Sequence, residues 1–146
     1  MPHNHSKLDT VLKYRSRLVE EAQIELAKLK QRLSIEETRL LQLDQKRKEV
    51  IHNMAERQNT GIKQEEISLS HQFIKLQGDR IHNQTRSVKM LSEEYESQRA
   101  HLESLLQEKK VVENIRNKRQ KVKADWLKKS ENDILDEVSG RREGSI

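Results

Sequence analysis

Three observations predict an all-α fold, a long antiparallel two-helix coiled-coil hairpin with a projecting C-terminal helix end. Apolar residues recur with a period of 3.5 in the first third of the chain, a second series with this period follows, and one turn signal separates them. Only 32% of the residues are hydrophobic and 36% are charged, which is too little apolar material for a rounded core but typical of a coiled coil. We therefore expect a single coiled-coil domain over residues 1–146.

The first helix is predicted over residues 7–58, where heptad positions alternate in steps of four and three without a break. Ser6, followed three residues later by Asp9, resembles a capping box at its start. Three heptad positions are polar and could fix the register of the pairing, or allow the hairpin to open or bend. The positions are Leu8, Leu12, Arg15, Val19, Ala22, Leu26, Leu29, Leu33, Glu36, Leu40, Leu43, Arg47, Val50 and Met54.

The strongest turn signal of the chain is the Gln58–Gly61 stretch, and we expect a turn or short helix over residues 59–66. Helix two is predicted over 67–139 and a loose tail over 140–146, while residues 63–70 form either the start of helix two or a separate short helix. Between Leu105 and Ile115 the apolar spacing shifts by three residues, which predicts a local overwinding of the supercoil. The apolar positions are Ile67, Ile74, Ile81, Val88, Leu91, Tyr95, Leu102, Leu105, Val112, Ile115, Val122 and Trp126.

A single turn between two such helices predicts an antiparallel pairing, because a parallel pairing would need a long return connection. The expected register places Leu8 opposite roughly Asn114, so helix two projects beyond helix one from about Ile115 to Gly140. The projecting end carries apolar residues that nothing in the hairpin covers. These are Val122, Trp126, Leu127, Ile134, Leu135 and Val138.

Composition and motifs argue against an enzyme. The chain has no cysteine, which excludes disulfides and thiol catalysis, and no apolar run approaches the ~20 residues that span a bilayer. Six histidines occur without metal-ligand spacing, and neither a phosphate-binding loop nor a zinc-protease motif is present. We expect no catalytic, cofactor-binding or metal site, and a soluble cytoplasmic protein that reaches a membrane only through partners.

Positive charge is concentrated in residues 109–129, which hold nine Lys or Arg and two Asp or Glu, a net charge of +7 against +5 for the whole chain. This segment is either a solvated helix face or a docking surface for an acidic protein or a nucleic acid. Trp126 among the bases favours a binding role, while the acidic stretch from Glu131 to Glu137 would repel a phosphate backbone. We therefore expect no nucleic-acid partner.

An apolar cluster lies near the turn: Phe73, Ile74, Leu76 and Ile81. Ile74 and Ile81 belong to the heptad series, whereas Phe73 and Leu76 lie beside it. An exposed aromatic residue could anchor a partner protein. Alternatively, Phe73 packs over the segment 63–70 and closes the turn.

Over nearly its whole length the chain resembles the FliJ family, the small coiled-coil proteins of the bacterial flagellar type III export apparatus. The likeness rests on the segments HQFIKLQGDRIHNQ (residues 71–84), EKKVVENIRNKR (108–119) and ENDILDEVSGRR (131–142), in this order and at this length. The family tends to have a leucine four residues after the aromatic residue, where this chain has Gln77.

The resemblance implies a non-enzymatic stalk and adaptor, similar in shape to the central stalk of rotary ATPases. Such proteins are thought to enter the hexameric flagellar export ATPase with the end of the hairpin where the termini meet. The other end is thought to reach the cytoplasmic domain of the membrane export gate. They are also thought to bind export chaperones. The implied location is the cytoplasm, peripherally at the inner face of the membrane at the flagellar base. The expected ring contacts are Arg116, Arg119, Val122, Lys123, Trp126 and Leu127, and the expected gate contacts are Leu43, Val50, Phe73, Leu76 and Arg80.

Three other interpretations are compatible with the sequence. The first is the equivalent stalk protein of a virulence injectisome, which genome neighbours would distinguish. The second is a basic coiled-coil nucleic-acid-binding protein, whose affinity would fall steeply with salt. The third is a cytoskeletal or scaffold coiled coil, which should form long homo-oligomers.

Overall fold

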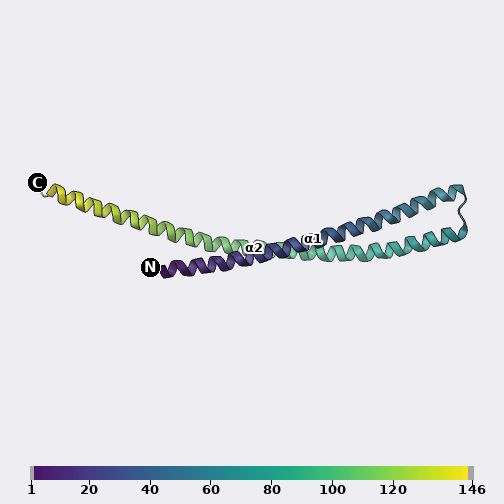
Figure 1. Ribbon diagram of the computed structural model, residues 1–146, viewed down its shortest axis with the longest axis horizontal. Helices are drawn as coiled ribbons and strands as arrows, with labels where there is room; N and C mark the ends of the chain where they lie inside the picture. Colours follow the sequence, from purple (N-terminus) through teal and green to yellow (C-terminus); the bar gives the residue numbers. More distant parts are fainter. Residues whose placement is uncertain (1, 145–146) are drawn as a thin grey trace. The chain divides into compact units, whose positions relative to one another are not determined.

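The computed structural model describes the backbone of residues 2–144 and the side chains of residues 7–141. It consists of two α-helices, α1 (Pro2–Thr60) and α2 (Gln64–Gly144), which pack against each other as an antiparallel hairpin (Figure 1). The predicted all-α coiled-coil hairpin is therefore confirmed. Within the described residues, neither helix has a stretch apolar enough and long enough to cross a membrane.

Both helices extend further than the sequence pattern indicated. Helix α1 begins at Pro2 rather than near Lys7, because proline is accepted in the first turn, where its missing N–H needs no partner. The proposed capping side chain of Ser6 lies outside the described side chains. Helix α2 begins at Gln64, without a separate short helix before it, and continues through Gly140 to Gly144.

The turn between the helices consists of residues 61–63 and is built from local capping contacts. Gly61 has a φ of 92°, the left-handed conformation that commonly ends an α-helix and that glycine adopts without strain. The first bond of α2 runs from the Ile67 N–H to the Lys63 carbonyl, at 3.1 Å. Glu65 and Glu66 in the first turn of α2 complement the helix dipole.

By packing, the chain divides into two compact units, and both helices contribute to each. The first unit comprises residues 1–20 and 103–146, and the second comprises residues 21–102. The single coiled-coil domain expected over residues 1–146 stays a prediction. All fourteen heptad positions predicted for α1 are buried or half-buried, so they form the seam, the line of side chains that faces α2. Among the described residues, Val19 and Leu29 are the buried apolar side chains of this seam, 4% and 6% exposed.

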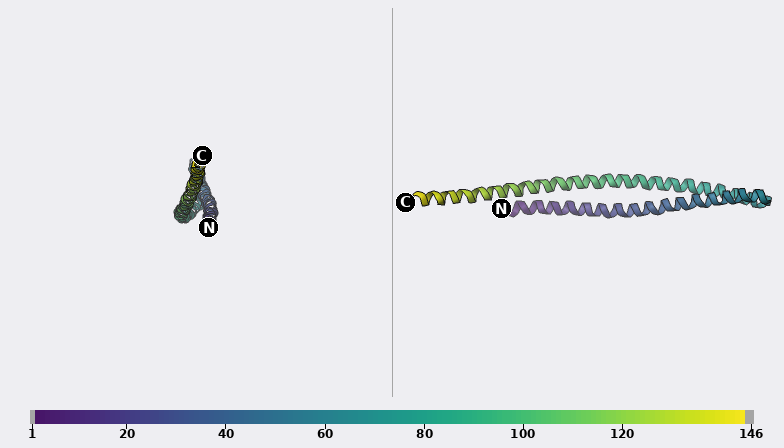
Figure 2. Two further views of the ribbon diagram at one scale, coloured as in Figure 1. Left: turned by 90° about the vertical axis from the view of Figure 1, so that its left-hand side faces the viewer. Right: turned by 90° about the horizontal axis from the view of Figure 1, so that it is seen from above.

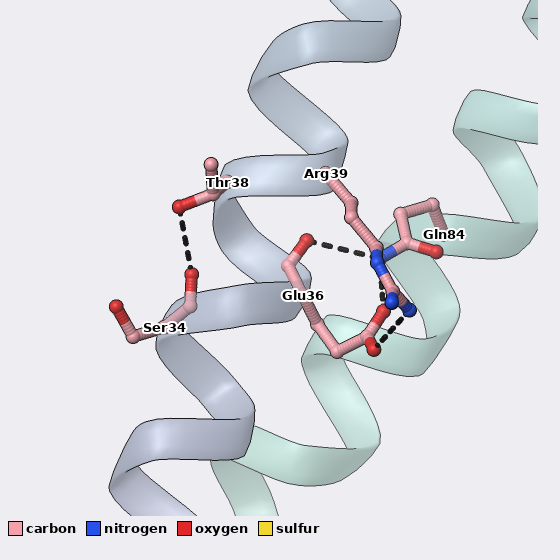
Figure 3. A network of polar contacts seen from close by, with 5 residues as sticks. All are labelled: Ser34, Glu36, Thr38, Arg39 and Gln84. Atoms are coloured by element: carbon pink, nitrogen blue, oxygen red, sulfur yellow. Dashed lines mark hydrogen bonds and ion pairs between the residues drawn. The ribbon is translucent and has the colours of Figure 1, made fainter.

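In the second unit, the polar seam residue Glu36 is paired across the hairpin (Figure 3). Its carboxylate accepts hydrogen bonds from Arg39 Nη1 at 2.8 Å and from Gln84 Nε2, and its main-chain carbonyl accepts a second bond from Gln84 at 2.9 Å. Gln84 lies on the seam of α2, so these bonds join the two helices at one level. A shift of register would leave a half-buried carboxylate against apolar side chains, which is unfavourable.

A second polar level of this unit surrounds Gln77, which is 2% exposed. Its Oε1 accepts a hydrogen bond from Arg80 Nη1 at 3.4 Å. The guanidinium of Arg47 lies over Gly78, where an added Cβ would be 3.6 Å from Arg47 Nη2, an ordinary van der Waals distance. The glycine thus lies beneath a flat cationic group but leaves room for a methyl group.

In the first unit, ion pairs between described side chains join the helices. Arg15 Nη1 is 2.6 Å from Glu108 Oε2, and Arg116 Nε is 2.9 Å from Asp9 Oδ1. These contacts agree with the expected pairing of Leu8 with roughly Asn114.

The predicted overwinding of the supercoil between Leu105 and Ile115 is wrong. The half-buried positions continue from Leu105 through Lys109 and Val112 to Arg116 in unbroken heptad steps, while Ile115 is exposed. The long side chains of lysine and arginine hold these positions because their aliphatic parts cover the seam while the charges reach water.

We predict that Gly78→Ala raises the free energy of unfolding by about 0.5–1 kcal/mol, because alanine favours the helix and its methyl group meets no steric conflict. Gly61→Ala should instead lower it, because an L-residue is strained at a φ of 92°. Urea unfolding followed by circular dichroism measures both changes. Equal destabilisation by the two substitutions would contradict this account of Gly78.

Candidate functional site

The first candidate site is the end of α2, which runs past the beginning of α1 within the first unit (Figure 2). We call residues 117–141, which follow the ion pair of Arg116 with Asp9 of α1, the free end. All its side chains are exposed except Ser130, which is half-buried. A helix without a packing partner is only marginally stable in water, so a partner that covers the free end would stabilise it.

Apolar and basic side chains share the first half of the free end. Val122 and Trp126 are 67% and 65% exposed, which is unusual for the only tryptophan of a chain with so few apolar residues. Lys118, Arg119 and Lys123 join these two residues in lining a shallow open hollow on the surface. Such a hollow, lined by two apolar and three cationic side chains, suits an apolar side chain flanked by carboxylates.

The structure brings most of the expected ring contacts together. Arg119, Val122, Lys123 and Trp126 line the hollow, and Leu127 is 47% exposed beside them. Arg116 differs from them, since it is half-buried and paired with Asp9 inside the hairpin. The ring contact itself stays a prediction.

The expected gate contacts lie in the second unit and fall into two groups. Leu43 and Val50 are half-buried on the seam of α1, where they contribute to the packing of the hairpin. Leu76 and Arg80 are exposed on α2, and Phe73 is half-buried. Leu76 and Arg80 are therefore the exposed members of this set, and the gate contact also stays a prediction.

Two exposed apolar residues of α2 in the second unit were not singled out from the sequence. Leu69 is 65% exposed and Met90 is 68% exposed. Their signal in the sequence is weak, because each lies off the heptad series and a single apolar residue on a surface is common. Leu69 lies one helical turn before Phe73 and thereby extends the apolar surface near the turn.

Among the described side chains, no group of three or more His, Asp or Glu is arranged to hold a metal ion. The hollow of the free end offers apolar surface and positive charge. The fold and its free end define a class of protein, a coiled-coil hairpin that presents one uncovered helix end for binding.

The model of the Flagellar FliJ protein family matches residues 4–144, and the chain belongs to this family. It is therefore a non-catalytic component of the flagellar protein export apparatus. Comparison with curated proteins and with solved structures gives no match.

We predict that Trp126→Ala changes the free energy of unfolding by no more than about 0.5 kcal/mol, because the indole is exposed. Leu29→Ala should lower it by about 2–4 kcal/mol, because Leu29 is one of the buried seam residues. Thermal or urea unfolding of the two variants measures the difference. A large loss with Trp126→Ala would mean that Trp126 packs within the hairpin.

Proposed function

We propose that this protein is a stalk and adaptor that bridges the hexameric flagellar export ATPase and the cytoplasmic domain of the membrane export gate. The proposal rests on family membership and on the one observation that a basic helix end exposes a tryptophan. It locates the protein in the cytoplasm, at the inner face of the membrane at the flagellar base, where its partners hold it.

The free end is the proposed contact with the ATPase ring. Its hollow is lined by Val122 and Trp126 together with three cationic side chains. Burial of a large aromatic side chain supplies affinity, and the surrounding positive charge steers association with an acidic surface. A single helix is also narrow, about 10–12 Å across with its side chains, which suits insertion into a ring.

The surface near the turn is the proposed contact with the export gate. Leu76 is 49% exposed, Phe73 is half-buried beside it, and Arg80 borders them. Both proposed contact surfaces belong to α2, so one continuous helix carries the connection between the two partners. The exposed apolar residues of this helix also offer a surface to export chaperones that deliver cargo.

For the ring contact, we predict that Trp126→Ala combined with Arg119→Glu and Lys123→Glu weakens ATPase binding about 100-fold or more, because anchor and charge are lost together. Isothermal titration calorimetry measures the affinity, and swimming in soft agar measures the effect on motility. The control is Lys30→Glu with Lys89→Glu, which makes the same change in charge at exposed residues away from the free end. Equal affinity of the triple variant and the unchanged protein would refute the ring contact.

For the gate contact, we predict that Phe73→Ala with Leu76→Ala reduces binding to the gate domain about tenfold or more and leaves the helix content unchanged. Pull-down and calorimetry with the purified gate domain measure the interaction. Met90→Ala is the control, because it removes another exposed apolar side chain elsewhere on α2. The contact is ruled out if the double variant binds the gate as well as the control does.

A further inference from the structure

One exposed stripe of residues follows α2 from the end of the hairpin through the free end. Its positions alternate in steps of four and three, so they lie on one side of the helix, and every one of them is exposed. The first five residues of the stripe are apolar or basic, and two acidic residues follow them. In order, the stripe consists of Ile115, Arg119, Val122, Trp126, Lys129, Asp133, Asp136 and Gly140.

The stripe lies beside the seam of α2 and shares Arg119, Trp126, Asp133 and Gly140 with the continuation of the seam series beyond Arg116. Ile115 is 41% exposed, whereas the next residue, Arg116, is half-buried against Asp9 of α1. Successive residues of an α-helix are turned by about 100°, so Ile115, Val122, Lys129 and Asp136, each one residue before a position of the seam series, lie to one side of that series. Every stripe residue is exposed in the single chain, so its surface is available to a second helix.

We propose that the stripe is the interface with a second copy of this chain, paired antiparallel through the two free ends. In the register that brings stripe positions to one level, Arg119 faces Asp136 of the other copy and Trp126 faces Lys129. Val122 faces Asp133 of the other copy. On that copy, Lys129 lies one helical turn from the Asp133 carboxylate. The pairing has twofold symmetry, so each contact occurs twice.

The order of charges along the stripe favours a second copy over other occupants. A helix that pairs with the stripe must carry acids opposite Arg119 and bases opposite Asp136. The same chain in the antiparallel direction carries them at the required spacing. A parallel copy would place Arg119 against Arg119 and Asp136 against Asp136, and this repulsion selects the antiparallel arrangement.

The contacts are expected to give weak association. Val122 and Trp126, 67% and 65% exposed in the single chain, supply the apolar area. The Arg119–Asp136 pairs and the contact of Lys129 with the indole face add electrostatic attraction that salt screens. Two single helices bury less surface than a permanent interface, so the complex exchanges readily with free chains.

Self-association would cover Arg119, Val122 and Trp126, which are also part of the proposed ring contact. Binding of these residues to another protein then competes with pairing of the free ends, and the competition follows from mass action. The dimer itself does not depend on the proposed function, because the arrangement is derived from the stripe alone.

Sedimentation equilibrium of the full chain, from micromolar to submillimolar concentration at low and high ionic strength, tests the proposal. The unchanged chain should show a monomer–dimer equilibrium that shifts toward monomer as salt is added. Arg119→Glu alone and Asp136→Arg alone should each raise the dissociation constant about tenfold or more, since each places like charges opposite each other twice. The double variant Arg119→Glu with Asp136→Arg should restore the dimer, because it exchanges the charges and renews the attraction.

The matched control is Lys121→Glu, which makes the same charge change at an exposed residue of α2 outside the stripe and should leave the dissociation constant within about twofold. Helix content by circular dichroism verifies that each variant folds. A chain that stays monomeric throughout, or a double variant that stays dissociated, overturns the proposal. Calorimetry with the export ATPase distinguishes the proposed dimer from the proposed ring contact. The double variant still lacks Arg119, so it should bind the ring weakly even though it dimerises.

Discussion

The contact of one narrow seam of α1 with one narrow seam of α2 is the constraint on which the rest of the structure depends. Each helix can cover only one side of the other, so most seam residues are half-buried and few are fully buried. Stability must therefore accumulate over many small contacts along the helices. This explains why the heptad spacing is kept without interruption, since one slip would turn every later apolar residue away from the partner helix.

A long seam of similar aliphatic residues does not by itself define which positions meet. In each unit, pairs of polar side chains on facing helices define which positions meet. Glu36 is bonded twice to Gln84 in the second unit, and Arg15 and Asp9 are paired with Glu108 and Arg116 in the first. Each pair adds little stability because it is partly exposed. A displaced register would separate them and leave polar groups against apolar side chains, so their contribution is specificity.

The sequence was sufficient to predict the hairpin and the α1 seam, because a period of 3.5 over many turns has few other structural solutions. It was less informative at the helix ends, where a single proline or glycine is compatible with both helix and turn, as Pro2 and Gly140 illustrate. The phase of α2 after Leu105 was misjudged because Lys109 and Arg116 hold seam positions. The exposure of Trp126 was predictable from the length of helix beyond α1, whereas the near-complete burial of Gln77 depends on neighbours across the hairpin.

The same spacing rule distinguishes the part of α2 that builds the hairpin from the part available for binding. Up to Arg116 the seam series is occupied by side chains that α1 covers. Continued beyond it, the series passes through Arg119, Lys123, Ser130 and Asp133, with Trp126 as its one aromatic or aliphatic member. Such a face cannot bury enough apolar surface to hold another arm of the same hairpin. Most exposed apolar residues of this end lie on other sides of the helix, among a basic segment and an acidic segment. The stability of this end therefore depends on a partner that supplies both apolar contact and opposite charge.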